Sequence, residues 1–249
     1  MINEALATIG EYVHLMGQTF RRPNRWRMFY RSLIREIVQL GVDSLWIVFI
    51  ISFFIGAVIT IQLSINIRSP LIPKFTIGYS AREIILLEFS STLMCLILAG
   101  KIGSSIASEL GTMRVTEQID ALDIMGVNSA NYLILPKIVG LVGFVPVLSI
   151  FSMVTGLCGG YIATYLVSDL PTNDFIYGLQ LMFNPGFILH SIEKSMVYAF
   201  IISSVASYHG YCVKGGALQV GKASTQAVVK SSILILFFDM LLTNLLLAK

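Results

Sequence analysis

Three charged residues lie inside apolar segments of this 249-residue sequence, and their placement suggests chemistry. They are Glu88, Lys194 and Asp239. A charged side chain near the middle of a membrane-spanning helix costs about 2.5 to 3.5 kcal/mol on insertion scales, so each one needs a partner or a function. An acid and a base so placed can pair to hold helices together, contact lipid headgroups, or relay protons and other ions.

The three charges are expected at a similar depth. Counted at 1.5 Å per residue from the ends of the apolar segments, all three fall roughly 9 to 14 Å from the same side. We therefore predict that Lys194 pairs with Asp239, with His190, Glu193 and Glu88 nearby. A purely structural pair and a role in handling lipid headgroups both fit this arrangement.

No arrangement of nucleophile, base and acid indicates an enzyme, and no spacing indicates a metal site. The histidines and cysteines are scattered along the sequence and no CxxC pair occurs. They are His14, His190, His209, Cys95, Cys158 and Cys212. We interpret the cysteines as small apolar side chains and the histidines as structural.

The segment GALQVGKA, residues 216 to 223, resembles the nucleotide-binding pattern GxxxxGK[ST] but fails at its last position. Ala223 stands where Mg²⁺ needs a hydroxyl, and Ser224 comes one residue late. No apolar strand precedes the segment either. No cofactor is therefore expected on this chain, and any ATP with Mg²⁺ would be used by a separate partner chain.

A polar segment, ELGTMRVTEQIDALDIMGV, occupies residues 109 to 127 of this otherwise apolar chain. Thr116 can cap a short helix that Gly126 ends. Apolar and acidic residues then form opposite faces of that helix: Ile119, Leu122 and Met125 on one, Glu117, Asp120 and Asp123 on the other. The helix either packs on the membrane domain with its acids in water or docks into a cleft of a soluble partner.

Glu109 is the second unusual feature of this segment. It falls near the carboxyl end of an expected span, where the helix dipole disfavours an acid by about 0.3 to 1 kcal/mol unless a base compensates. Arg114 is the nearest candidate base. Small residues every four positions precede it and predict close helix packing, within the chain or between copies. They are Ala99, Gly103, Ala107 and Gly111.

Composition places these residues on membrane helices. The sequence is 55% hydrophobic and 12% charged, whereas soluble domains average roughly 25% charged residues. Several apolar runs exceed the roughly 20 residues that cross a bilayer. The net charge of +3 is small and its bases are scattered, which indicates no nucleic-acid partner.

The sequence therefore predicts an all-α integral membrane protein with about five transmembrane helices. The expected spans are residues 44 to 67, 82 to 107, 132 to 167, 187 to 209 and 227 to 248. The third run is too long for one straight span, and its prolines and glycines can kink or break it. They are Pro136, Pro146, Gly156, Gly159 and Gly160.

Residues 1 to 35 form a separate N-terminal part, and residues 36 to 249 form the membrane domain. Apolar residues at helical spacing within residues 3 to 20, followed by a basic elbow, predict an interfacial helix on the cytosolic membrane surface rather than one docked on the protein itself. Six arginines precede the first span, whereas loop 168 to 186 contains no Lys or Arg. The N-terminus is therefore expected in the cytosol, and five crossings place the C-terminus outside.

The run AGKIGSSIASELGTMRVTEQIDALDIMGV, with GGALQVGKASTQAVV and FFDMLLTNLLL, resembles the MlaE-type permease of bacterial ABC lipid transporters that work with MCE-domain proteins. The resemblance covers about residues 30 to 249. It implies an inner-membrane homodimer that moves phospholipid with a cytosolic ABC ATPase and a periplasmic MCE-domain protein.

The resemblance also implies that residues 116 to 126 form the coupling helix held by the ATPase. The candidate contacts are Glu109, Arg114, Glu117, Gln118, Asp120 and Leu122. One segment and one single residue depart from many relatives: Leu87 to Ser91 replaces Arg-Glu-Leu-Gly-Pro and keeps only the acid, and Lys101 replaces an Arg. The first departure lies in the outer half of the second span, away from the expected ATPase contact.

Candidates for a lipid route are apolar and weakly polar residues near the outer ends of the first two spans, because a cavity for acyl chains is largely apolar. They are Gln62, Leu63, Ile67, Tyr79 and Phe89. Three other functions are alternatives for this sequence: an ion-driven secondary transporter using the three buried charges, a lipid-modifying membrane enzyme, and a non-transporting anchor for a cytosolic complex. The first needs inverted repeats that the sequence does not contain, and the second needs convergent catalytic groups.

Overall fold

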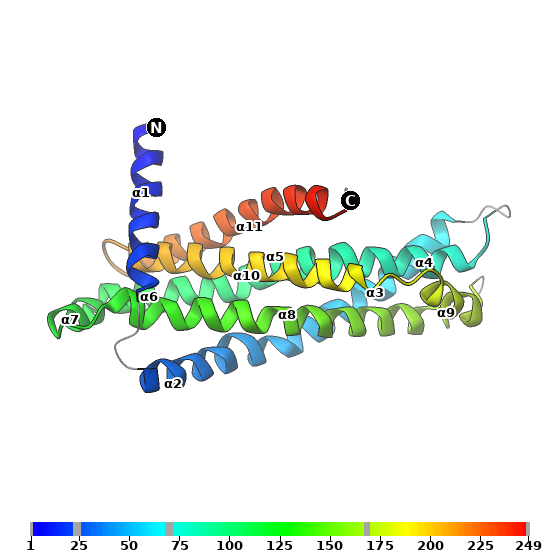
Figure 1. The fold of residues 1–249 in the computed structure, drawn as a ribbon, viewed down its shortest axis with the longest axis horizontal. Coiled ribbons are helices and arrows are strands. Elements are labelled where there is room, and N and C mark those ends of the chain that lie inside the picture. Colours follow the sequence, from blue (N-terminus) through cyan, green and yellow to red (C-terminus); the bar gives the residue numbers. More distant parts are fainter. Residues whose placement is uncertain (1, 22–25, 68–71, 167–169, 248–249) are drawn as a thin grey trace. The chain divides into compact units, whose positions relative to one another are not determined.

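The computed structural model describes residues 2–21, 26–67, 72–166 and 170–247, and the regular elements in these ranges are all helical (Figure 1). Within these ranges, five helices are long and apolar enough to cross a membrane, as predicted. The chain divides into two compact units. Unit 1 comprises residues 1–42, 96–144 and 197–238, and unit 2 comprises residues 43–95, 145–196 and 239–249.

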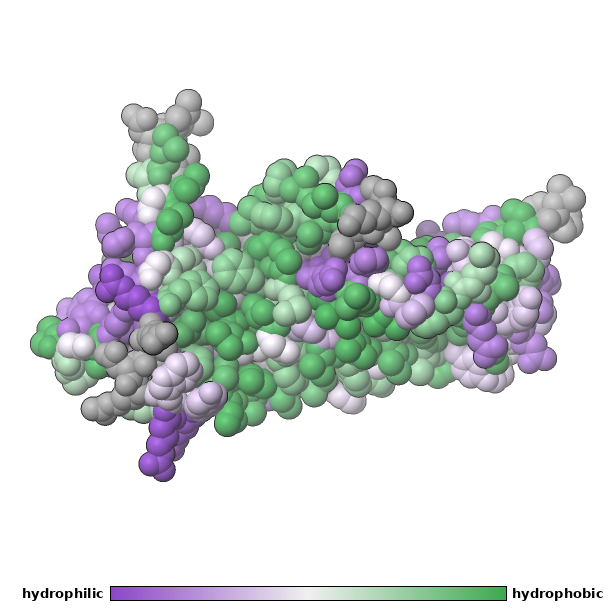
Figure 2. All heavy atoms as spheres, viewed as in Figure 1, coloured by the Kyte–Doolittle hydropathy of each residue, from purple (hydrophilic) through white to green (hydrophobic). Residues whose placement is uncertain are grey.

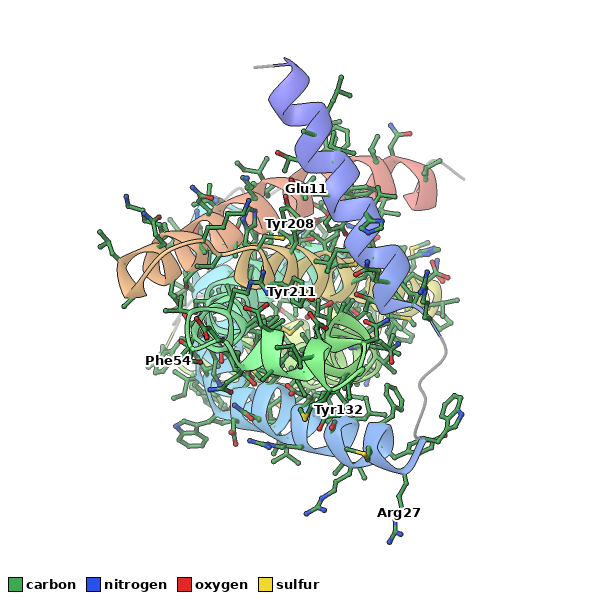
Figure 3. All side chains as sticks on the ribbon, turned by 90° about the vertical axis from the view of Figure 1, so that its left-hand side faces the viewer. Glu11, Arg27, Phe54, Tyr132, Tyr208 and Tyr211 are labelled. Carbon is green, nitrogen blue, oxygen red and sulfur yellow. The ribbon has the colours of Figure 1, made fainter. Side chains whose placement is uncertain are left out.

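The N-terminal elements are two helices and a joint. They are α1 (Ile2–Thr19), α2 (Trp26–Glu36), the π-helical η1 (Ile37–Gly41), the 3-10 turn η2 (Val42–Ser44) and α3 (Leu45–Asn66). Arg22 and Arg25 of the expected basic elbow lie outside the described residues, whereas Arg27 projects outward from α2 (Figure 3). The second half of that elbow is therefore helical and leads without a break toward the first span.

The second span is one long helix that contains two π-helical segments. Its segments are α4 (Phe75–Ile84), the π-helical η3 (Ile85–Leu93), α5 (Met94–Leu98), the π-helical η4 (Ala99–Gly103) and α6 (Ser104–Val115). In η3 the Ser90 hydroxyl donates to the Ile85 carbonyl at 2.8 Å. π-helical turns are rare and occur frequently at functional sites. The two segments therefore make this helix a candidate for a functional role.

The remaining helices follow in order: α7 (Gln118–Ile124), α8 (Ser129–Ala163), α9 (Thr172–Gln180), α10 (Gly186–Tyr211) and α11 (Ala217–Leu247). The run predicted to kink or break forms a single helix, α8, that contains Pro136 and Pro146, so it is not broken there. Neighbouring helices and local adjustments satisfy the backbone groups that proline leaves unpaired in membrane proteins.

Unit 2 is held together by helices that approach closely at glycines. A Cβ atom on Gly56 of α3 would lie 1.9 Å from the Gly156 carbonyl oxygen of α8, and one on Gly159 would lie 2.0 Å from the Phe53 carbonyl oxygen. The Ser52 and Ser152 hydroxyls are hydrogen-bonded at 2.8 Å beside this crossing. Small residues and a short polar contact thus join α3 to α8 in the way membrane helices commonly pack.

In unit 1 the predicted row of small residues faces the protein's own helices. Ala99, Gly103, Ala107 and Gly111 are all buried. A Cβ atom on Gly103 would lie 3.8 Å from Ile202 of α10. One on Gly210 of α10 would lie 2.8 Å from the Ala107 carbonyl oxygen. This row therefore packs α6 and η4 within the chain.

Candidate functional site

The short helix α7 begins differently from the sequence prediction. Its N-cap residue is Glu117, which has a left-handed backbone with φ of 59° and makes no side-chain cap. The Thr116 hydroxyl instead donates to the Thr112 carbonyl at 2.8 Å and accepts from Gln118 Nε2 at 3.0 Å. The predicted Thr116 cap was therefore wrong, because its hydroxyl closes the end of α6.

The end of α7 follows the prediction that Gly126 terminates it. Gly126 has φ of 75°. Its N–H donates to the Asp123 carbonyl at 3.0 Å, and the Val127 N–H donates to the Leu122 carbonyl at 3.1 Å. These two bonds form a Schellman motif, in which a glycine in the left-handed conformation closes the helix.

The exposed surface of α7 is mixed rather than purely acidic. Ile119 is fully buried and Leu122 is half-buried, whereas Met125, predicted on the same apolar face, is exposed. Ile124 is 87% exposed. Glu117, Gln118 and Asp123 are also exposed. Because exposed aliphatic side chains beside acids suit a protein contact better than a fully solvated helix, this surface is the candidate docking site.

Both sides of α7 are tied to its own unit through Tyr211 of α10. Arg114 Nη1 lies 2.6 Å from Asp120 Oδ1, and the Arg114 guanidinium lies 5.9 Å from the Tyr211 ring centroid. The Tyr211 hydroxyl bonds Ser129 Oγ at 2.7 Å, and the Ser129 N–H donates to Asp123 at 3.3 Å. Figure 3 shows Tyr211 projecting beneath α10 toward this region. The docking surface is therefore held in a defined position.

The residues that follow α7 hold the C-terminal end of α1. Asn131 Nδ2 donates to the Thr19 carbonyl at 2.7 Å and to the Arg21 carbonyl at 2.5 Å. Asn128 Nδ2 donates to the Gln18 carbonyl at 3.2 Å. The start of α8 thus caps α1, which sequence reasoning did not anticipate.

Further polar contacts join α1 to α10. The Tyr12 hydroxyl donates to Ser204 at 2.9 Å, and the Tyr208 hydroxyl donates to Glu11 at 3.0 Å, where Figure 3 shows Glu11 above Tyr208. The expectation that α1 does not dock on the protein was thus wrong for its C-terminal half. An apolar stripe nevertheless stays exposed along α1, visible in Figure 2: Leu6, Ile9, Val13 and Phe20.

Glu109 is compensated by a base that sequence reasoning missed. Its Oε2 lies 2.8 Å from Lys137 Nζ, and Lys137 also contacts Glu36 Oε1 at 2.8 Å and Oε2 at 2.9 Å. Arg114, the predicted base, pairs with Asp120 instead. The available signal was Lys137 itself, a charge within the apolar run of the third span that needed a partner. We call Lys137, Glu36 and Glu109 the Lys137 triad.

Glu88, Lys194 and Asp239 lie together in unit 2. Lys194 Nζ lies 3.0 Å from Asp239 Oδ1 and 3.1 Å from Glu88 Oε1. The Thr92 hydroxyl donates to Asp239 at 2.9 Å. The Lys194 side chain is 2% exposed and that of Glu88 is 42% exposed. His190 and Glu193 form a separate contact of 3.7 Å.

The five candidates for a lipid route differ in exposure. Gln62 is exposed. Leu63 and Ile67 pack against the core of unit 2 formed by Ile77, Ala81, Leu170 and Phe175. Tyr79 lies 4.9 Å beneath the Arg82 guanidinium. Phe89 is buried. Phe89 therefore contacts protein rather than an open surface in this structure.

The segment that resembles a nucleotide-binding motif is helical. Residues 217 to 223 form the first turns of α11, which begins two residues after Gly215 with φ of 116°. A phosphate-binding loop needs irregular backbone whose N–H groups point at the phosphates. Among the described residues, no three His, Cys, Asp or Glu side chains are grouped as metal ligands would be.

Comparison with known proteins identifies similar chains. Residues 33–245 match the family described as Permease MlaE. The chain is 34% identical over 222 residues to a probable ABC transporter permease protein of Rickettsia bellii, which covers 88% of this chain and 84% of the relative. It is 30% identical over 234 residues to a probable ABC transporter permease protein of Synechocystis, which covers 93% and 88%.

A plant protein is also similar. The chain is 28% identical over 237 residues to the protein TRIGALACTOSYLDIACYLGLYCEROL 1, chloroplastic, of Arabidopsis thaliana, which covers 92% of this chain and 65% of the relative. The residues matched to the family include α7 and all members of the two charge clusters.

Proposed function

This chain belongs to the MlaE permease family, and from that membership we propose that it is the membrane subunit of an ABC transporter that moves phospholipid or a related lipid between the inner membrane and the cell envelope. It is a transport subunit rather than an enzyme. In this proposal ATP and Mg²⁺ are used by a separate cytosolic ATPase, and this chain binds no cofactor.

The observation that carries the proposal is the surface of α7. Ile124 and Met125 are exposed beside Glu117 and Gln118, while Ile119 anchors the helix from below. Such a surface fits a groove in which apolar side chains are buried and acids meet Arg or Lys. We assign α7 as the coupling helix and its exposed residues as the ATPase contact.

The lipid substrate is supported by two observations. The name of the Arabidopsis relative contains that of a glycerolipid, trigalactosyldiacylglycerol. In unit 2, Gln62 is exposed and Leu63, Ile67 and Tyr79 are half-buried, so each retains some surface that an acyl chain could contact. Phe89 would join it only after a rearrangement, because it is buried.

A second copy of the chain is the proposed membrane partner. Figure 2 shows apolar side chains over the C-terminal part of α11, where large apolar residues are exposed. They include Ile233, Leu236, Phe237, Met240 and Leu245. Such a surface is covered by acyl chains or by another protein. We propose a homodimer that also binds a periplasmic MCE-domain protein.

The test is purification of the tagged chain from its native membrane, with mass spectrometry of accompanying proteins and lipids. The expected result is recovery of an ABC ATPase, an MCE-domain protein and phospholipid. The purified assembly should then move fluorescent phospholipid out of proteoliposomes or into them only when ATP is added. Reproducible recovery of the chain alone, from extracts that contain such subunits, would contradict the proposal.

A further inference from the structure

The Lys137 triad joins three elements around the docking helix. Glu109 lies on α6, which ends just before α7, and Lys137 lies on α8, which begins just after it. Glu36 is the last residue of α2, directly before the π-helical η1. The helices on both sides of α7 are therefore bonded to each other and to the end of α2, which precedes the first span.

The contacts of the triad are strong ones. Lys137 is 1% exposed, its three N–O distances are 2.8 to 2.9 Å, and both carboxylates are charged partners. Hydrogen bonds between charged groups are roughly twice as strong as neutral ones, and a poorly solvated position strengthens them further. A single ammonium group thus fixes the relative positions of α2, α6 and α8.

The triad carries one more negative charge than a neutral structural pair would. One base faces two acids, and Lys137 with Glu36 alone would already be neutral. Glu109 lies at the middle of α6, six residues before its last residue Val115, and its carboxylate reaches across to α8. The third charge therefore adds a connection to α6 that neutrality does not require.

We propose that Lys137 is a positioning residue that transmits the displacement of α7 to the first span. When the ATPase moves α7, the triad makes α6 and α8 move together and carries α2 and η1 with them. Without it, the two helices beside α7 could separate, and the displacement would be absorbed locally. This inference rests on the proposed function, because it needs an ATPase that displaces α7.

The test compares variants in the purified complex reconstituted with phospholipid. Glu36→Gln and Glu109→Gln each remove one connection, Lys137→Met removes both, and Lys137→Arg keeps them. Lys230→Met makes the same change at an exposed lysine of unit 1 and serves as the matched control. For each variant, three quantities are measured: ATPase bound, ATP hydrolysed and lipid moved per ATP.

The expected result is a lower lipid-to-ATP ratio with near-normal ATPase binding and hydrolysis. A drop of at least about fivefold is expected for both Glu→Gln variants, the lower end of typical coupling between sites. Lys137→Met should fall further, while Lys137→Arg and Lys230→Met stay within about twofold of the parent. A role confined to folding would lower yield or melting temperature and leave this ratio unchanged in the protein that assembles.

Glu36→Gln is the decisive variant, because Glu36 is not a candidate ATPase contact and the remaining Lys137 and Glu109 form a neutral pair. A normal lipid-to-ATP ratio in Glu36→Gln would overturn the inference, even if the Glu109→Gln variant no longer binds the ATPase. If Lys137→Met does not accumulate, the two Glu→Gln variants decide alone. Absence of any ATP-dependent lipid movement in the parent complex would instead refute the proposed function, and the inference with it.

Discussion

At the scale of single residues, this chain places each of two buried lysines between two carboxylates. Lys137 contacts Glu36 and Glu109, and Lys194 contacts Glu88 and Asp239. Removing one partner of a buried charge pair is far more damaging than replacing the whole pair, because an uncompensated charge is left behind. The lysines should therefore tolerate substitution less well than the acids around them.

Loss of Lys194 should destabilise the protein. Lys194→Met leaves Glu88 and Asp239 facing each other without a cation, and we expect a loss of about 3 to 5 kcal/mol. The measurement is the midpoint of thermal unfolding of detergent-purified protein. Lys194→Arg keeps the charge and should remain close to the parent.

Exchange of the two charges tests the pairing directly. Lys194→Asp combined with Asp239→Lys restores an opposite-charge pair at the same two positions. We expect the double variant to recover part of the protein lost from the membrane in each single variant, measured by immunoblot. No recovery would show that the 3.0 Å contact contributes nothing by itself.

Glu117 combines a strained backbone with a candidate partner contact, and substitutions can separate the two. Its left-handed conformation costs about 1 kcal/mol for a residue with a side chain, whereas glycine adopts it freely. Glu117→Gly should therefore slow hydrogen exchange of the α7 amides.

Glu117→Lys keeps the strain and reverses the charge, and should weaken ATPase association or uncouple hydrolysis from transport. Normal association and coupling in Glu117→Lys would rule out a role for this carboxylate.

At the scale of elements, helix contacts depend on where glycine is placed along α8. Gly159 faces the Phe53 carbonyl oxygen, whereas a Cβ atom on Gly143 would meet nothing within 4 Å. The same residue type therefore has a packing role at one position of the helix and none at the other.

Alanine substitution should distinguish these two glycines. Gly159→Ala forces α3 and α8 apart and should destabilise the protein by about 1 to 3 kcal/mol, as overpacking does. Gly143→Ala should be neutral or stabilising by up to about 1 kcal/mol, because alanine favours a helix. Thermal unfolding in detergent measures both, and equal midpoints would contradict the α3–α8 contact.

At the scale of the whole molecule, an odd number of crossings places the termini on opposite sides of the membrane. Five helices in the described part of the chain are long and apolar enough to span it. The arginines before the first span predict that the N-terminus is cytosolic. Two spans precede α7, so α7 would also lie on the cytosolic side, within reach of a cytosolic ATPase.

Reporter fusions test this topology. Alkaline phosphatase fused after Lys249 should be active, since that enzyme requires the periplasm, and the same enzyme inserted after Val127 should be inactive. A fluorescent protein fused before Met1 should fluoresce as a cytosolic control. Activity of both phosphatase fusions would contradict the three crossings expected between Val127 and Lys249.

The sequence by itself determined the elements and their environment. Apolar runs long enough for a bilayer predicted the five long helices, and Gly126 predicted the end of α7, because both signals are local along the chain. The EQIDAL segment supplied the family. Charges at similar depth also pointed to Lys194 and Asp239 as neighbours.

Only the tertiary structure decided which charges meet and which faces are covered. Lys137 is separated from Glu109 by 28 residues and from Glu36 by 101, so no local pattern relates them. Arg114 was assigned to Glu109 because it is near in sequence, but helix geometry directs it to Asp120. Met125 and the C-terminal half of α1 were misplaced for the same reason: periodicity defines a face, whereas long-range packing determines what that face contacts.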